Sequence, residues 1–93
     1  MEYINKVEIS GEIAEIRTSE KGTNFVMLKQ MVTYNNIERP RLFEVLIAAE
    51  RKELTEKISV GKMVKFIGIL TVFKMKKFNI HKMLIEANSV ELI

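Results

Sequence analysis

The stretch ERKELTEKISVGKMVKFIGIL, residues 50–70, decides the fold because its hydrophobic period changes halfway along. In the first half, Leu54 and Ile58 lie four positions apart among charged residues, which predicts a short amphipathic helix over 50–58. The second half opens a long apolar run, residues 62–74, which predicts a strand with Gly68 inside it. A short helix therefore leads directly into a long strand.

Further strands are predicted on both sides of this pair. Residues 6–16 alternate in hydrophobicity, and one face of this strand carries Val7, Ile9, Gly11 and Ile13. The glycine in that face indicates a bulge or strong coiling. The remaining strands are predicted over 24–34, 42–49 and 77–93, with a turn at 17–23 and a loop at 35–41.

The resulting order is strand, strand, strand, helix, strand, strand. This is the order of the oligonucleotide/oligosaccharide-binding (OB) barrel, and glycines within strands suit its coiling. The alternative, a small SH3-like barrel, would not need a helix at that point. We therefore expect an all-β fold with one short helix: a five-stranded OB-fold barrel, as a single domain over residues 1–93, with the helix between strands 3 and 4.

Composition narrows the class of protein. The 93 residues are 47% hydrophobic and 29% charged, which is typical of one globular domain. The absence of cysteine excludes a disulfide framework and thiolate metal sites, and indicates a reducing, cytoplasmic location. No apolar run has the length of a signal peptide core or a membrane span. A lone His81 gives no metal site, so we expect neither metal nor cofactor.

Positive charge is concentrated in one part of the chain. The net charge is only +3, but the segment between Glu56 and Glu86 holds seven lysines and no acidic residue. Such asymmetry indicates a polyanionic partner, most simply nucleic acid, although a solvated basic face is the alternative.

Residues 71–83, TVFKMKKFNIHKM, interleave rings with lysines in the hairpin between the fourth and fifth strands. Unstacked bases bind flat rings and phosphates bind cations, so this pattern predicts a surface for single-stranded nucleic acid. Alternatively, the rings close the hairpin and the lysines are merely solvated. The candidates are Phe73, Lys74, Lys76, Lys77, Phe78 and Lys82.

Secondary candidates lie in the second and third strands and the loop between them. Arg39 and Arg41, on either side of Pro40, could hold phosphates or belong to a solvated turn. Tyr34 could stack on a base or lie at the barrel edge. Lys29 is expected on the outer face of the second strand with Phe25, Met27 and Met31, where it can touch the nucleic-acid backbone or a partner subunit. Phe66 is assigned to the core.

Three stretches resemble the bacterial single-stranded-DNA-binding protein family: INKVEISGEI (4–13), ISVGKMVKFIGIL (58–70) and IEANSVELI (85–93). The resemblance implies an OB fold that binds single-stranded DNA. That family's third strand usually opens with a tryptophan, whereas Leu42 and Phe43 stand here, so stacking would fall to Tyr34, Phe43, Phe73 and Phe78. Since the sequence stops at Ile93, we expect a short form without the family's acidic tail.

We therefore expect sequence-tolerant binding of single-stranded DNA in replication, recombination or mobile-element maintenance. The alternatives are an OB-fold interaction module of a replication or primosome assembly, and an RNA-binding OB domain. No catalytic arrangement is present in the sequence, so an enzyme is not expected. Because both faces of KFIGIL (65–70) are apolar, we also expect a homo-oligomer, either a dimer or a tetramer.

Overall fold

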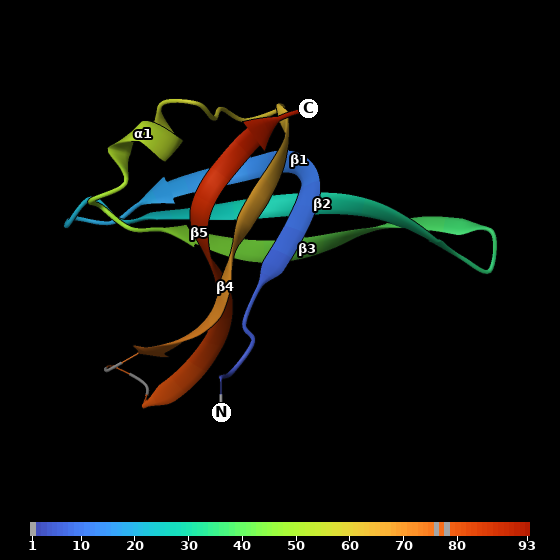
Figure 1. Cartoon of the computed structure of the whole chain (residues 1–93). Coiled ribbons are helices and arrows are strands. Elements are labelled where there is room, and N and C mark those ends of the chain that lie inside the picture. Colours follow the sequence, from blue (N-terminus) through green and yellow to red (C-terminus); the bar gives the residue numbers. More distant parts are fainter. Residues whose placement is uncertain (1, 76, 78) are drawn as a thin grey trace.

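The computed structural model describes residues 2–75, 77 and 79–93, and its strands close into a barrel in the order β1-β2-β3-β5-β4 (Figure 1). The strands are β1 (Val7–Thr18), β2 (Asn24–Tyr34), β3 (Ile37–Ile47), β4 (Met63–Met75) and β5 (Ile80–Leu92). A short helix, α1 (Lys52–Thr55), connects β3 to β4. Neighbouring strands are antiparallel except β3 and β5, which are parallel. The expected five-stranded OB barrel is confirmed.

The helix is shorter than the predicted span of 50–58. Past Thr55 the chain continues in single turns, in which the amides of Lys57 and Ile58 donate to carbonyls only three residues earlier. Leu54 and Ile58 are nevertheless both buried, as their spacing predicted. No helix in the described part of the chain is long and apolar enough to cross a membrane.

Two glycines allow strands to approach closely where the sheet bends. β1 pairs with β4 over residues 7–12 and with β2 over residues 12–18, so it serves two sides of the barrel. At this transition a Cβ on Gly11 would lie 2.6 Å from the carbonyl oxygen of Lys29. At Gly68, where the β4–β5 register shifts, a Cβ would overlap the carbonyl oxygen of Glu86. The coiling indicated by these glycines is therefore present.

The core lies inside the barrel and is built from the alternate residues that the sequence pattern selects. Phe66 is fully buried, as expected, together with Ile13, Leu28 and Val64. The short helix contributes Leu54 to the same cluster and so covers one end of the barrel. This rigid core holds the strands from which the hairpins project.

The predicted loop over 35–41 is wrong. Residues 37–41 belong to β3, and only Asn35 and Asn36 form the turn, both with positive φ angles. Such a turn suits a two-residue hairpin, for which asparagine is favoured. Pro40 opposes Met31 within the ladder. Among the described residues, β3 pairs with β5 only at Val45 and Leu46, so the edge of β3 beside Pro40 is open. The proline has no N–H, and on an open edge its absence removes no ladder hydrogen bond.

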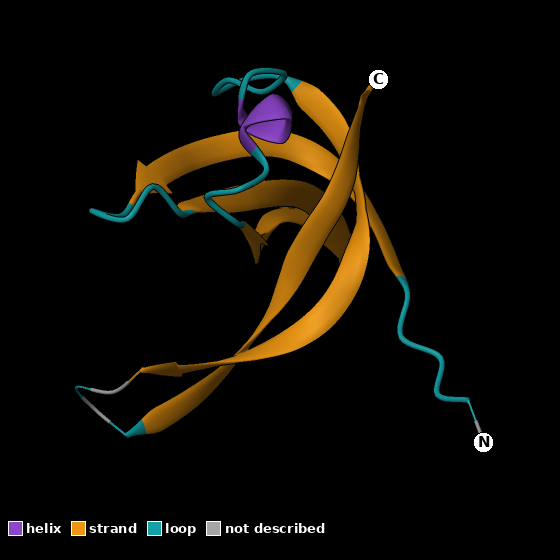
Figure 2. Cartoon of the chain, turned by 60° about the vertical axis from the view of Figure 1, so that its left-hand side comes forward, coloured by secondary structure: helices purple, strands orange, loops and turns teal. Residues whose placement is uncertain are grey.

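Two hairpin extensions leave the barrel in different directions (Figures 1 and 2). The β2–β3 arm, residues 30–41, projects to the right in Figure 1. The β4–β5 arm, residues 70–75 and 80–85, curves away at the bottom of both views. Most of the residues singled out from the sequence lie on these extensions.

Candidate nucleic-acid interface

The β4–β5 arm separates its candidate residues onto opposite faces. Directly paired residues of an antiparallel ladder share a face, and successive residues alternate. Phe73 is paired with Lys82, and Lys74 is paired with His81. One face therefore carries Phe73 and Lys82, while Lys74 and His81 point the other way.

Phe73 closes one side of a groove on the outside of the barrel. Its ring stands edge-on to Phe25 of β2, with centroids 6.0 Å apart and planes inclined by 78°. The two rings and the β1–β2 turn, including Lys21, border a cavity of about 470 Å³. Phe73 remains 41% exposed, so part of its ring is free to meet a ligand. The β4–β5 arm thus bends over the outer face of β2.

A second cavity on the same outer face lies at the fork where β5 separates from β3. This cavity of about 390 Å³ is lined by Met27, Leu42, Glu44, Lys82 and their neighbours. The ammonium of Lys82 lies 2.7 Å from a carboxylate oxygen of Glu44. We call the surface formed by Phe25, Met27, Glu44, Phe73 and Lys82 the outer groove.

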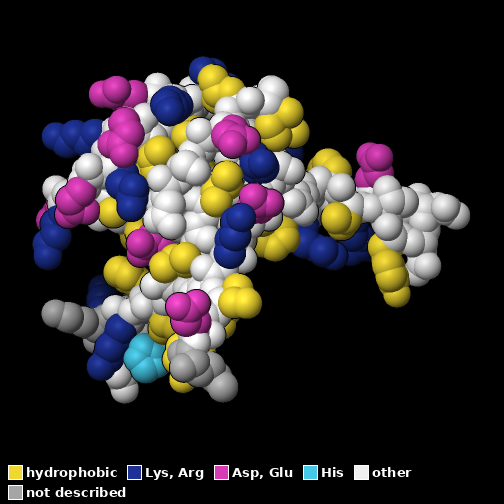
Figure 3. Space-filling model, viewed as in Figure 1, with side chains coloured by type: hydrophobic (Ala, Val, Ile, Leu, Met, Phe, Trp, Pro, Cys, Tyr) yellow, Lys and Arg dark blue, Asp and Glu magenta, His cyan; other side chains and the backbone are white. Residues whose placement is uncertain are grey.

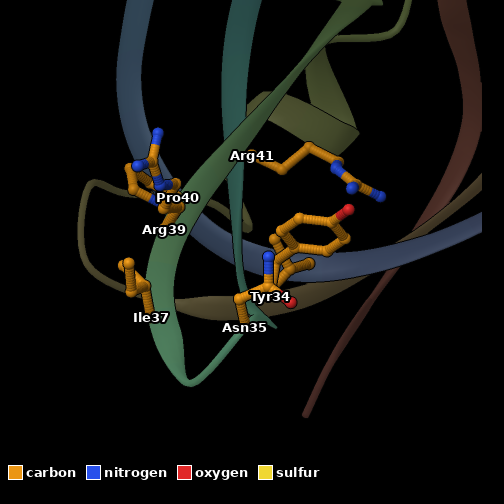
Figure 4. Close-up of a pocket in the computed structure, with 7 residues that line it drawn as sticks. Tyr34, Asn35, Ile37, Arg39, Pro40 and Arg41 are labelled. Carbon is orange, nitrogen blue, oxygen red and sulfur yellow. The ribbon is translucent and has the colours of Figure 1, made fainter.

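The β2–β3 arm gathers three of the predicted residues. Val32 is paired with Arg39, and Tyr34 with Ile37, so these side chains share one face with Arg41 two residues along. Together they border a cavity of about 530 Å³. Figure 4 shows the side chain of Arg41 extending toward the ring of Tyr34. An exposed ring and two guanidinium groups therefore line one surface.

The cations of this arm are not neutralised by neighbouring acids. Within residues 2–75, 77 and 79–93, neither Arg39 nor Arg41 has a carboxylate within ion-pair distance. Tyr34 is 74% exposed. Figure 3 shows basic side chains beside apolar ones along this arm. Both arginines are therefore available to an external anion.

The contacts of Lys29 and Phe43 reduce their availability to a nucleic acid. Lys29 is on the outer face of β2, as expected, but its ammonium is 3.5 Å from the carboxylate of Glu12. Phe43 opposes Leu28, which faces the interior, and packs against the core cluster. Its role as a stacking ring stays a prediction, and only its partly exposed edge is free for it. Leu42, at the position next to it, points outward and is exposed.

The tip of the β4–β5 arm is only partly described. Lys76 and Phe78 were predicted to bind nucleic acid, but they lie outside the described residues. Lys77 lies in a turn and is exposed.

Sequence reasoning missed Glu44 as part of the site. The lysine-rich segment was expected to lack balancing acids, yet Lys82 is balanced by this glutamate from another strand. A signal was available, because Glu44 is the single acid in residues 42–49. On a strand its side chain alternates with Phe43 and Val45 and so points outward. Its pairing with Lys82 could not be predicted from the sequence, because the two residues come together only through tertiary contacts.

Comparisons with known proteins agree on the fold. No family model matches the chain, and no curated protein matches it. A solved structure described as a small single-stranded DNA binding protein from Mycoplasma pneumoniae is similar, with a TM-score of 0.76 and 24% identity. That match covers 96% of this chain and 93% of the other.

Structures of PriB proteins are also similar. PriB from Ralstonia solanacearum gives a TM-score of 0.61 at 16% identity, covering 97% of this chain and 98% of the other. The N-terminal domain of PriB from Thermoanaerobacter tencongensis, described as dimeric, gives 0.61 at 20% identity, with 96% of each chain covered. At these identities the likeness establishes the shared fold. The chain has the OB fold that its topology shows.

Proposed function

We propose that this protein binds single-stranded DNA without reading its sequence, along the outer groove and the β2–β3 arm. The observation that carries the proposal is the surface of Tyr34, Arg39 and Arg41, where an exposed ring lies beside cations that no described carboxylate neutralises. A flat ring accepts any base, and a guanidinium accepts any phosphate, so this combination is sequence-tolerant.

The outer groove and the surface of Tyr34, Arg39 and Arg41 lie on opposite faces of the β2–β3 ribbon, because strand alternation separates Phe25 and Met27 from Tyr34. Phe73 and Tyr34, one on each arm, offer exposed ring area for bases. Arg39 and Arg41 supply cations on the β2–β3 arm, whereas Lys74, on the β4–β5 arm, points away from the outer groove. Each stacked base contributes roughly 1–3 kcal/mol, whereas each phosphate contact adds a salt-dependent increment. Binding of this kind needs no catalytic group.

The similar structures favour DNA as the ligand. The Mycoplasma pneumoniae protein, described as a single-stranded DNA binding protein, matches over nearly the whole chain. In OB folds, the face of strands 2 and 3 and the loops beside it form the common ligand site. The outer groove lies on that face, and we propose that it holds the strand in the cytoplasm during replication or a related process.

A fluorescence-anisotropy titration tests this function. The probe is a labelled oligo(dT) of about 35 nucleotides, long enough for several OB domains, with duplex of the same length and oligo(rU) as comparisons. We expect sub-micromolar binding to the single strand, weakening with salt, and little binding to the duplex. Equal affinity for the duplex, or no binding at low salt, would contradict the proposal. Stronger binding to oligo(rU) would assign the site to RNA instead.

We further propose that the protein acts as a homo-oligomer. Ile67 and Ile69 on the outer face of β4 are only half-buried in the monomer. Self-association would cover them and would join several DNA-binding surfaces, which raises avidity. The similar PriB domain is described as dimeric. Sedimentation at tens of micromolar should show a dimer or tetramer, and a single monomeric species would contradict this proposal.

A docking function is the second candidate, supported by a different observation. The β2–β3 arm exposes Met31 and Ile37 in addition to Tyr34, and Leu42 is exposed at its base. Exposed apolar side chains on one projecting hairpin suit a protein partner, such as a component of a replication assembly. This reading would be favoured if the wild-type protein bound no single strand but did bind a purified replication partner. Changing Ile37 and Leu42 to serine should then abolish binding of that partner.

A further inference from the structure

The ion pair between Glu44 and Lys82 joins the two walls of the outer groove. The other ion pairs among the described residues join side chains two positions apart in the sequence or strands that are directly paired over several residues. Glu44 is on β3 and Lys82 is on β5, just beyond the short parallel ladder of Val45 with Ile85. The pair therefore spans the fork where the arms diverge.

We propose that Glu44 is a built-in competitor for phosphate, which masks Lys82 and lowers the affinity of the outer groove for nucleic acid. This inference rests on the proposed binding of single strands. Lys82 has the position expected of a phosphate ligand, because it shares a face with Phe73 at the groove wall. Its charge, however, is already satisfied by a carboxylate at 2.7 Å.

The exchange of one anion for another yields little free energy. A phosphate that reaches Lys82 must displace Glu44, whose side chain is 19% exposed and would be left without its cation in a partly desolvated groove. The like charges of the phosphate and this carboxylate also repel each other. Lys82 consequently contributes little to binding in the wild-type protein, although its side chain is 47% exposed.

The substitution Glu44→Gln tests the masking. It keeps the shape of the side chain and releases Lys82, so we expect binding of oligo(dT) to tighten roughly two- to fivefold at low salt. The dependence of log K on log salt should steepen by up to about 0.7, the value of one phosphate contact on a single strand.

Glu91→Gln is the matched control. It also breaks an ion pair, with Lys65 at 3.2 Å, and changes the net charge equally. The pair lies at the other end of the β4–β5 ladder, away from the outer groove. We expect Glu91→Gln to show neither the tighter binding nor the steeper salt slope of Glu44→Gln.

A double-mutant cycle with Lys82→Gln separates masking from general electrostatics. In the Lys82→Gln background, Glu44→Gln should no longer steepen the salt slope, because no cation remains to be released. Lys82→Gln alone should leave the slope nearly unchanged. Should Glu44→Gln fail to fold, Glu44→Ala serves in its place, since the argument needs only removal of the carboxylate.

The outcomes distinguish this inference from the proposed function. Wild-type binding together with an unchanged or weaker affinity in Glu44→Gln would overturn the masking and leave the function standing. An equal steepening in the Lys82→Gln background would also overturn it, since the effect would then be general. A wild-type protein that binds no single strand overturns both.

Discussion

Phe73→Ala separates the contribution of a stacking ring from that of charge. The substitution removes a ring that packs edge-on against Phe25 and is still 41% exposed. Loss of the aromatic pair should lower the free energy of unfolding by about 0.5–1.5 kcal/mol, plus a smaller amount for lost burial. The domain should remain folded, because the ring lies outside the core cluster.

The effect on binding should be larger than the effect on folding. One stacked base contributes roughly 1–3 kcal/mol, which corresponds to a loss of about five- to 150-fold in affinity. No charge is removed, so the slope of log K against log salt should stay unchanged. The assay is anisotropy with labelled oligo(dT) at several salt concentrations, alongside a urea unfolding curve.

Val72→Ala is the control for this prediction. Val72 is the preceding residue of β4, is exposed, and points to the opposite face of the arm. Its truncation should leave affinity within about twofold of wild type, as expected for surface changes away from a ligand. Wild-type affinity in Phe73→Ala, or equal losses in both variants, would refute the assignment of Phe73 as a stacking ring.

Three further predictions test the arm and the barrel. Replacing both Arg39 and Arg41 by glutamine should weaken binding to all sequences and reduce the salt slope by about 1.4, two contacts of about 0.7 each, and an unchanged slope would exclude both as phosphate ligands. Gly68→Ala should lower the free energy of unfolding, measured with urea, by about 3 kcal/mol or more, because its Cβ would overlap the backbone of β5. A near-neutral effect would contradict the register of β4 and β5. Asn24→Ala should lower the free energy of unfolding by about 1–3 kcal/mol, because this buried side chain forms hydrogen bonds with the hydroxyls of Thr18 and Thr55. A melting temperature equal to that of wild type would contradict this role.

Much of the fold follows from local patterns in the sequence. Two patterns, the change of period at residues 50–70 and the alternation in the first strand, depend on which face each residue buries. The helix, the strands and the buried faces that they predicted are confirmed. The boundaries were less predictable. Residues 35–41 contain two asparagines and a proline, which favour a loop, yet the asparagines make a two-residue turn and the proline lies at an open strand edge.

The site was less predictable than the fold because it depends on tertiary contacts. Proximity in the sequence suggested that Phe73, Lys74 and Lys82 act together, but strand alternation places Lys74 on the opposite face. Glu44 reaches Lys82 from a different strand, and no local pattern encodes that approach. By contrast, Tyr34, Arg39 and Arg41 do border one cavity, because a tight turn folds their strands into one hairpin.

The most direct test of the central claim is an amide chemical-shift titration of the nitrogen-15-labelled protein with short oligo(dT). The account predicts that the shifts gather along the outer groove and the β2–β3 arm, at Phe25, Phe73, Arg39 and Arg41, and that they diminish with salt. Shifts confined to α1 and to the end of β5 near Glu91, or no shifts at low salt, would contradict it.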